Sequence, residues 1–317
     1  MQLKSIVKRL LPYLPRWAQQ GVRRRVEEQR LAQHNARKQR TKIKLADVVA
    51  QLERFDLDAD VMVHGSISSI GKLDRPIPHL VENLLRIVNT ERNTLLVPAL
   101  PYNTTMKEYL DGLDSFDLRT AKNAMGVISN IVMDMSGALR SLHPTHSVVA
   151  LGPSAQDYIQ GHHLDATPFG VNSPYAKLTI RRGKILLIGV GLNAVTCFHV
   201  YEDLLDSACP VQVYLPSRYN LACTDQSGNV VPVRTAAHNP KVSATRDCER
   251  ARTWLEDAGA IQSVPLGESE LTIIDAWLFT VTLLEHLKKG ESIYGKVKIR
   301  PEHLANIESR ITELKRM

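Results

Sequence analysis

From Ala46 onward the chain alternates short apolar runs with amphipathic stretches. Runs of the length of a buried strand occur at 61–63, 95–97, 147–150, 184–188 and 211–215. Apolar residues at helical spacing predict helices near 77–88, 123–139, 194–206, 244–258 and 270–289. This alternation predicts an α/β fold, a layered αβα sandwich with a mainly parallel central sheet. The turn residues of 224–232 predict a hairpin, and hence a small antiparallel portion.

The first 45 residues differ from the remainder of the chain. Leu, Ile, Val and Trp recur at helical spacing between Leu3 and Trp17, with lysine and arginine between them. Residues 1–45 carry a net charge of +11, whereas residues 46–317 carry −4. We therefore expect a basic amphipathic tail (1–45) followed by one domain (46–317). The tail suits an anionic membrane surface, or it packs on the domain or on a second subunit of a homo-oligomer. Nucleic acid is a poor fit, because zinc spacing, a reading-helix motif and aromatic interleaving are missing.

His199 and Glu202 are the strongest candidate for catalysis. They are three residues apart in a predicted helix, so the carboxylate lies on the same face as the imidazole. Such a carboxylate fixes the tautomer of a histidine and stabilises its protonated form, as a general base requires. A solvated surface pair is the alternative. Asp203, four residues from His199, competes with Glu202 for the same role.

Cysteine and histidine spacing argues against metal and thiol chemistry. The four cysteines form no C-x-x-C pair, which together with the absence of a recognisable signal segment predicts a cytoplasmic protein. His143 and His146 are separated by Pro144 and lack a third ligand. Cys197 is two residues from His199 and would point away from it on a helix, so we expect no acyl-cysteine.

Two turns follow predicted strands and could hold an anion. Gly189-Val-Gly-Leu-Asn-Ala194 imitates the fingerprint of an NAD-binding fold, yet the acidic residue expected at the end of the next strand is missing. A tight turn that presents His199 explains these glycines more simply. Ser66, Ser68 and Ser69 with Gly71 follow the strand at 61–63, where hydroxyls and backbone N–H groups could converge on a phosphate.

Ordered blocks in the sequence resemble the aminoglycoside 3-N-acetyltransferase family. The blocks are Val63-His-Gly-Ser-Ile-Ser-Ser-Ile-Gly71, Thr94 to Pro101, Phe116 to Thr120, Arg140 to Gly152, Pro168 to Leu178, and Gly183 to Glu202. The similarity spans roughly residues 47 to 297. It implies an enzyme of the acyltransferase class that moves acetyl from acetyl-CoA to an amine, without a metal, so that 46–317 would be the acetyltransferase domain.

The resemblance also implies roles for individual residues. His199 would be the general base and Glu202 its orienting carboxylate in a direct transfer. The coenzyme groove would be formed by Ser66, Ile67, Ser68, Gly71, Arg140, His143, Ser147 and Thr196. The acceptor would be bound by Asp117, Asn193 and Asp203.

One departure from the family pattern concerns the acceptor. Asn193 replaces an aspartate of the family's motif, and 203–240 does not match the pattern. Because recognition of a polycation depends on carboxylates, we expect a small-molecule or carrier-linked amino sugar, as in surface-polysaccharide biosynthesis, with the protein soluble or peripheral on the inner membrane face. Acetylation of an aminoglycoside antibiotic is the alternative within the family. An NAD-dependent oxidoreductase and a non-catalytic membrane-bound scaffold are the alternatives of other classes.

Overall fold

A seven-stranded mixed sheet forms the centre of the molecule. A computed structural model describes residues 41–317. Across the sheet the strands are β11 (Ile261–Leu266), β12 (Ser269–Asp275), β8 (Lys184–Ile188), β2 (Val61–Gly65), β4 (Leu95–Pro98), β7 (Val148–Leu151) and β6 (Leu139–Arg140). The three central strands, β8, β2 and β4, are parallel to one another. The outer strands pair antiparallel on both sides. The α/β class is confirmed, and the sheet is more antiparallel than its apolar runs predicted.

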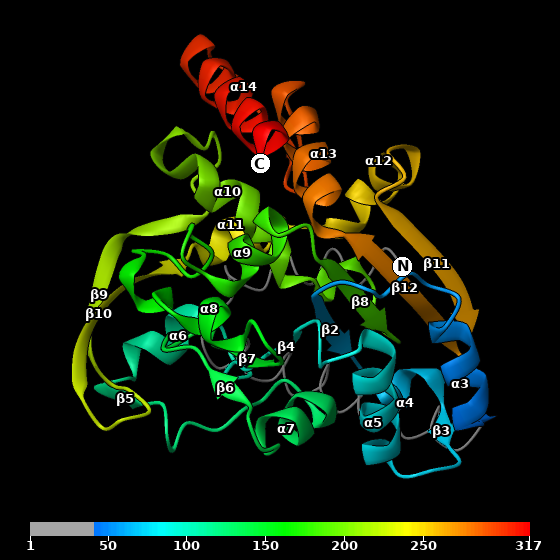
Figure 1. The fold of residues 1–317 in the computed structure, drawn as a ribbon. Coiled ribbons are helices and arrows are strands. Elements are labelled where there is room, and N and C mark those ends of the chain that lie inside the picture. The colour runs from blue at the N-terminus through cyan, green and yellow to red at the C-terminus, as the bar shows by residue number, and fades with distance from the viewer. Residues whose placement is uncertain (1–40) are drawn as a thin grey trace, which may run out of the picture.

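Side chains of the central strands alternate between two apolar layers. Val61 and Val63 face one layer and Met62 faces the other, as the two-residue period of a strand requires. One layer is covered by α3 (Leu45–Leu52), α4 (Ile67–Ile70), α5 (Ile77–Val88) and α7 (Val127–Met133). The opposite layer is covered by α8 (Ala155–Ile159), α9 (Pro174–Ile180), α10 (Val200–Leu205), α12 (Arg252–Asp257), α13 (Ala276–Lys288) and α14 (Pro301–Arg316). The sandwich is therefore closed on both faces (Figure 1).

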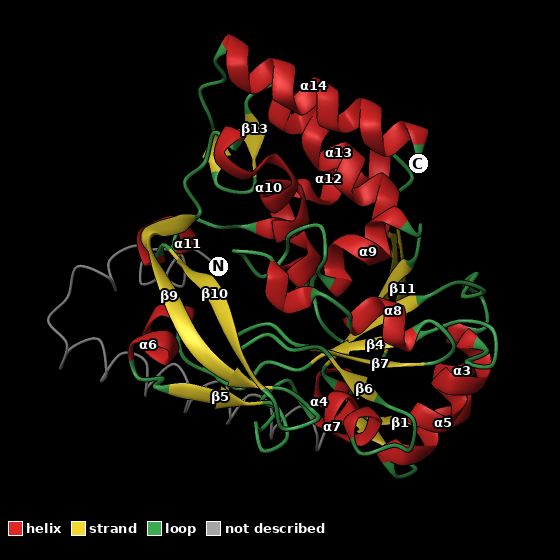
Figure 2. Ribbon diagram, turned by 60° about the vertical axis from the view of Figure 1, so that its left-hand side comes forward, coloured by secondary structure: helices red, strands yellow, loops and turns green. Residues whose placement is uncertain are grey.

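A smaller sheet extends from one side of the sandwich. Its long hairpin pairs β9 (Tyr214–Thr224) with β10 (Val230–His238) antiparallel, and β5 (Ser115–Asp117) adds to β9 in parallel. Figure 2 shows this hairpin beside α6 (Met106–Asp111) and apart from the strands of the main sheet. Phe116, Cys223 and Val233 lie in its own apolar cluster. The hairpin predicted at 224–232 is confirmed.

Short elements complete the part of the chain that the structure describes. They are β1 (Lys42–Ile43), β3 (Lys72–Leu73), β13 (Glu291–Ser292), β14 (Gly295–Lys296), α11 (Pro240–Ser243) and the 3-10 turns η2 (His162–Leu164), η3 (Leu192–Ala194), η4 (Thr196–His199), η5 (Asp206–Ala208) and η6 (Cys248–Ala251).

Helix boundaries follow the apolar pattern only in part. Helix α5 coincides with the prediction at 77–88. The helix predicted at 270–289 begins only at Ala276, because 269–275 forms strand β12. The helix predicted at 194–206 is divided into η3, η4 and α10. Residues 211–213 precede β9 instead of belonging to it.

The predicted tail does not end at residue 45. Ile43 is 6% exposed and lies in the apolar layer of α3, and Lys42–Ile43 pairs with β3. Residues 41–45 therefore belong to the body, and the remainder of the predicted tail lies outside the described residues. In residues 41–317 no helix combines the length and apolarity needed to cross a membrane.

Several histidines are part of the interior. His143 and His162 are fully buried and their rings stack with centroids 4.6 Å apart. His162 Nδ1 is 2.8 Å from Ser141 Oγ, and Nε2 is 2.9 Å from the Pro168 carbonyl. Burial lowers the pKa of His162 to about 3, and it lowers the pKa of His64 on β2 to about 4. These imidazoles are thus neutral in the folded protein.

We expect the fold to lose stability in mild acid. The unfolded chain protonates histidine below pH 6.5 whereas the folded chain does not, so stability falls from about pH 6.5 down to about pH 4. At pH 5 each such histidine costs about 2 kcal/mol, against a total of roughly 5–15 kcal/mol for a domain. Six histidines have a pKa lowered by burial, and together they outweigh Glu202 and Asp203, whose raised pKa values act in the opposite direction. Urea unfolding at pH 7 and pH 5 measures this. His79→Ala, at an exposed position, should leave the pH dependence unchanged. Equal urea midpoints at both pH values would contradict the expectation.

Candidate functional site

The imidazole of His199 is buried between the carboxylate of Glu202 and the guanidinium of Arg246. Its Nδ1 is 2.6 Å from Glu202 Oε2, and both side chains are nearly inaccessible, 5% and 0% exposed. Its Nε2 is 2.6 Å from Nη1 of Arg246, which lies in the loop between α11 and η6. The predicted pairing of His199 with Glu202 is confirmed as a contact, and its burial removes the alternative of a solvated surface pair.

The hydrogen bonds on both sides of the ring determine its protonation. A guanidinium group only donates, so Nε2 of His199 must accept from Arg246. The ring proton is then on Nδ1, which donates to the Glu202 carboxylate. His199 is therefore neutral, with the lone pair on Nε2 available to a substrate once Arg246 moves away. This is the tautomer that a general base requires.

Burial and the adjacent arginine shift the pKa of His199 in the same direction and that of Glu202 in opposite directions. Burial lowers the pKa of His199 well below its usual value, and the charge of Arg246 lowers it further. Burial raises the pKa of Glu202, whereas Tyr294 and Arg246 act in the opposite direction. The buried carboxylate is thus compensated by a cation across a neutral ring.

Asp203 does not compete with Glu202 for the base. Its Oδ2 accepts from the backbone N–H of Phe169 at 2.9 Å and from the hydroxyl of Tyr214 at 3.0 Å. Burial raises the pKa of Asp203 to about 7. The carboxylate therefore joins α10 to the loop before α9 and to strand β9, and its predicted contact with an acceptor is replaced by a structural one.

The turn after β8 brings the sheet edge to His199. Gly189 has φ of 69°, and a Cβ there would lie 2.6 Å from the Ser66 carbonyl oxygen. The short turn η3 follows, instead of the long helix of a dinucleotide-binding unit. Gly189 is therefore needed for the close contact between the ends of β8 and β2. Its glycine turn no longer supports an NAD-binding site, because no long helix follows it. Asn193 Oδ1 accepts from the Cys248 N–H at 3.2 Å, and Thr196 is half-buried.

The serine turn after β2 is partly open. Ser66 Oγ is 2.8 Å from Ser69 Oγ and 3.4 Å from Ser68 Oγ, and all three residues are half-buried. Ile67 is instead 5% exposed and packs in the core. A Cβ on Gly71 would lie 2.6 Å from the Thr41 carbonyl oxygen, so this glycine permits packing of β1. Of the predicted turn, the serine side chains alone are placed to meet a ligand.

Three predicted groove residues, Arg140, His143 and Ser147, form hydrogen bonds within the protein itself. Arg140 donates to the Ala99 and Ala121 carbonyls at 2.8 and 2.6 Å and to Ser147 Oγ at 2.9 Å. Ser147 is fully buried and donates to Ala99. His143 is fully buried, and its Nδ1 accepts from the His146 N–H at 3.1 Å. These side chains hold the loop before β7, because polar groups removed from water must be paired within the protein.

Asp117 and Cys197, two further residues considered from the sequence, are both engaged in contacts away from the imidazole of His199. Asp117 lies on β5 of the smaller sheet and forms an ion pair with Arg119 at 2.7 Å, so nothing brings it to His199. Cys197 is buried against Met62, and burial raises the pKa of its thiol to about 12. It is therefore no nucleophile at neutral pH. Within residues 41–317 no three histidine, cysteine or acidic side chains are grouped to hold a metal ion.

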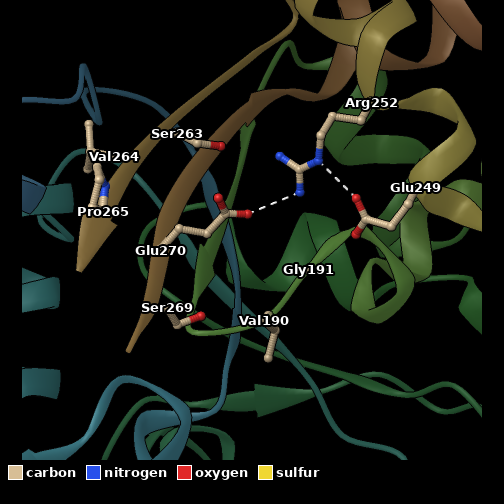
Figure 3. A pocket seen from close by; sticks show the side chains of 9 residues that line it. All are labelled: Val190, Gly191, Glu249, Arg252, Ser263, Val264, Pro265, Ser269 and Glu270. Atoms are coloured by element: carbon tan, nitrogen blue, oxygen red, sulfur yellow. Dashed lines mark hydrogen bonds and ion pairs between the residues drawn. The ribbon is translucent and has the colours of Figure 1, made fainter. Parts of the chain in front are cut away.

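A hollow of about 610 Å³ lies at the edge of the sheet where β2 and β8 end. Its wall includes Val190 and Gly191 after β8 and residues 263–265 and 269–270 of β11 and β12. Arg252 stands on this wall between Glu249 and Glu270, at 2.9 and 3.0 Å (Figure 3). From Gly191 the chain continues through η3 and η4 to His199. One segment thus connects the hollow to the base.

The groups facing Nε2 of His199 were not predicted from the sequence. Arg246 comes from a loop 47 residues further along the chain. His238, at the end of β10, has its ring centroid 4.3 Å from that of His199. Neither residue belongs to a motif or a regular spacing. An isolated arginine beside Asp247 is typical of a surface loop, so the sequence carried no signal for them.

The chain matches a family model described as aminoglycoside 3-N-acetyltransferase over residues 62–287. Aminoglycoside N(3)-acetyltransferase IX of Micromonospora chalcea is 31% identical over 163 residues, which cover 47% of this chain and 57% of that protein. The chain therefore spans little more than half the length of the curated relatives it matches.

Solved structures share the fold. AAC-IIIb in its binary complex with CoASH has a TM-score of 0.63 at 22% identity, covering 78% of this chain and 97% of that chain. Aminoglycoside acetyltransferase AAC(3)-IVa, as a histidine-to-alanine mutant in complex with a gentamicin, has a TM-score of 0.64 at 22% identity, covering 86% and 98%. The resemblance predicted from the ordered blocks is confirmed by the family match, which covers well over half of the sequence. The chain belongs to the aminoglycoside 3-N-acetyltransferase family.

Proposed function

We propose that this protein transfers acetyl from acetyl-CoA to an amine of an amino sugar. The observation that carries the proposal is the buried His199, whose Nδ1 is held by Glu202 and whose Nε2 lone pair points to an exchangeable neighbour, Arg246. Family membership supports acetyl-CoA as the donor. A structural neighbour was solved with CoASH, and another with a gentamicin.

In the proposed reaction the amine adds to the thioester carbonyl while Nε2 of His199 takes its proton. The new C–N bond forms, the C–S bond breaks, and the coenzyme leaves as a thiol after it receives a proton from the imidazolium. Glu202 keeps the ring oriented and stabilises its protonated form. The transfer is direct, because Cys197 is buried and its thiol pKa is raised.

The coenzyme would lie at the sheet edge. The hollow beside Val190 and Gly191 adjoins the serine turn, since Gly189 packs on Ser66. Ser66 and Ser68 offer hydroxyls there, and Thr196 precedes the base by one turn. The pantetheine arm would then follow the segment from Gly191 to His199. Asn193 lies along this route, with its side-chain oxygen already bonded to the Cys248 N–H.

The acceptor class is inferred from the relatives. Their names favour an aminoglycoside-type amino sugar over the carrier-linked amino sugar of polysaccharide assembly that Asn193 suggested. Aminoglycosides are therefore the first acceptors to test. A free alkylamine is mostly protonated at neutral pH and an ammonium ion cannot add to a carbonyl, so the deprotonated fraction of the amine adds, and His199 takes the second proton as the tetrahedral intermediate forms.

Replacing the base tests the mechanism. His199→Ala should lower kcat by about 10²- to 10⁴-fold, because positioned proton transfer contributes that much, while the Kd for coenzyme A stays within about threefold. Glu202→Gln should lower kcat less, because the amide oxygen still accepts from Nδ1. Steady-state kinetics of CoA release measures both. Asp203→Asn is the matched control on the same helix and should mainly lower Tm. A kcat near wild type in the His199 variant would refute the mechanism.

Replacing a serine tests where the coenzyme binds. Ser66→Leu should raise the KM for acetyl-CoA about tenfold or more, because a branched side chain fills the turn and removes a hydroxyl that can bind the coenzyme. The acceptor KM should change little. Ser115→Leu, on exposed β5, is the control. If the acceptor KM rises and that of acetyl-CoA does not, the two substrates occupy the opposite positions.

The basic tail is proposed to hold the protein on anionic lipid, a proposal supported by its charge and its apolar stripe. Each lysine or arginine near the surface contributes about 1 kcal/mol, which salt screens. Full-length protein should co-sediment with anionic vesicles at low salt and be released at high salt. Deleting 1–40, which spares Ile43, should abolish sedimentation and leave activity intact. Full-length protein that remains in the supernatant at low salt would exclude the tether.

A further inference from the structure

Arg246 differs from the other arginines near the site because its guanidinium contacts a neutral ring and no carboxylate of residues 41–317. Its guanidinium is half-buried, and within the described residues its single hydrogen-bonded partner is His199 Nε2. Arg252, six residues later, is held instead by two carboxylates. Arg246 has no described carboxylate in direct contact, and Glu202 reaches it only across the imidazole ring, so the guanidinium keeps its capacity to bind an anion. Arg246 is therefore free to exchange its one neutral partner for an anion.

His238 adds an unmatched donor or acceptor at the same place. Its Nε2 is buried and has no hydrogen-bond partner among residues 41–317. Its ring lies 4.3 Å from that of His199, centroid to centroid, and 6.0 Å from that of His146. Burial lowers the pKa values of all three histidines and the charge of Arg246 lowers them further, so the guanidinium lies among the imidazoles.

Each carboxylate of this region has one oxygen engaged in hydrogen bonds, while Glu202 Oε1 and Asp203 Oδ1 are buried without a hydrogen-bond partner among the described residues. Glu202 accepts from Nδ1 of His199, and Asp203 accepts from the Phe169 N–H and from Tyr214. Neither Oε2 of Glu202 nor Oδ2 of Asp203 is therefore available to a cation that approaches from the side of Nε2. The charged group bonded on this side is the Arg246 guanidinium, with the neutral ring of His238 beside that of His199, so an anion suits this side better than a second cation.

Protonation of His199 during the reaction makes an anion beside Arg246 more favourable. When His199 takes the proton of the amine, its imidazolium pairs with Glu202, and Arg246 loses the compensation that this carboxylate gave it across the ring. Two adjacent cations in a buried site repel each other. An anion bound to Arg246 removes the repulsion and draws the guanidinium away from the lone pair that the reaction needs.

We propose that the acceptor is an amino sugar that carries a phosphate or carboxylate on the same sugar as the reacting amine, with the anionic group bound by Arg246 and His238. This deepens the proposed function and rests on it, because it takes His199 as the base. Arg246 would then select the acceptor, and binding of the anionic group would uncover Nε2 of the base.

Paired acceptors that differ by one phosphate test the proposal. Glucosamine 6-phosphate, glucosamine and gentamicin are compared by the rate of CoA release from acetyl-CoA. Wild type should prefer glucosamine 6-phosphate over glucosamine in kcat/KM by about 10- to 100-fold, as expected for charge-assisted hydrogen bonds. Arg246→Gln should abolish the preference and leave the KM for acetyl-CoA within about threefold. Arg250→Gln, at an exposed position in the next turn, should retain the preference.

Other outcomes overturn the proposal. Equal or better use of glucosamine or gentamicin by wild type would remove the anionic requirement and leave the proposed function intact. A loss of kcat in Arg246→Gln that is the same for both sugars would assign the arginine to the oxyanion of the reaction. A raised KM for acetyl-CoA alone would assign it to the coenzyme's phosphates.

Binding separates this proposal from the proposed function. If no acceptor is acetylated, the proposed function fails, and calorimetry with glucosamine 6-phosphate then decides on the anion site. Binding to wild type that weakens about tenfold or more in Arg246→Gln, and not in Arg250→Gln, supports the site. Equal affinity in both variants, or no binding to wild type, overturns it.

Discussion

The site depends on one buried balance of charge, in which Glu202 and Arg246 face each other across the neutral ring of His199. A carboxylate as deeply buried as Glu202 would be costly without a nearby cation. Arg246 supplies that cation, and it also occupies the nitrogen that must accept a proton. The resting arrangement is therefore closed, and the proposed reaction would require a substrate that replaces Arg246 without leaving its charge unmatched.

Much of the fold followed from the period of apolar residues. The central strands β2, β4 and β8 and helix α5 were predicted because they are long or evenly spaced and are buried over their length. The antiparallel strand β12 was missed because its apolar residues run directly into those of α13. A continuous apolar run does not tell a strand from a helix. Sheet direction was missed for a related reason, since buried strands look alike in either orientation.

The site was predictable where its chemistry is local. His199 and Glu202 are three residues apart, so helical geometry alone brings them together. The bonds of Arg140 and Ser147 could not be predicted, because a polar residue in a loop can face a ligand or the protein's own carbonyls. Only the structure shows that both side chains donate to the Ala99 carbonyl. Arg246 could not be found, because its contact with His199 depends on the path of the chain after β10.

The residues around His199 come from two separate parts of the fold, the main sheet with its layers and the hairpin of the smaller sheet. The main sheet and its layers hold the strand ends, the hollow and the pair of His199 with Glu202. The hairpin supplies Tyr214 and His238, and the chain that leaves it supplies Arg246. The hairpin has its own apolar cluster, apart from the two layers of the main sheet, and it joins the core behind His199 through the bond of Tyr214 to Asp203. Under the proposed function, substitutions at the hairpin end would therefore change the choice of acceptor more than they change acetyl transfer.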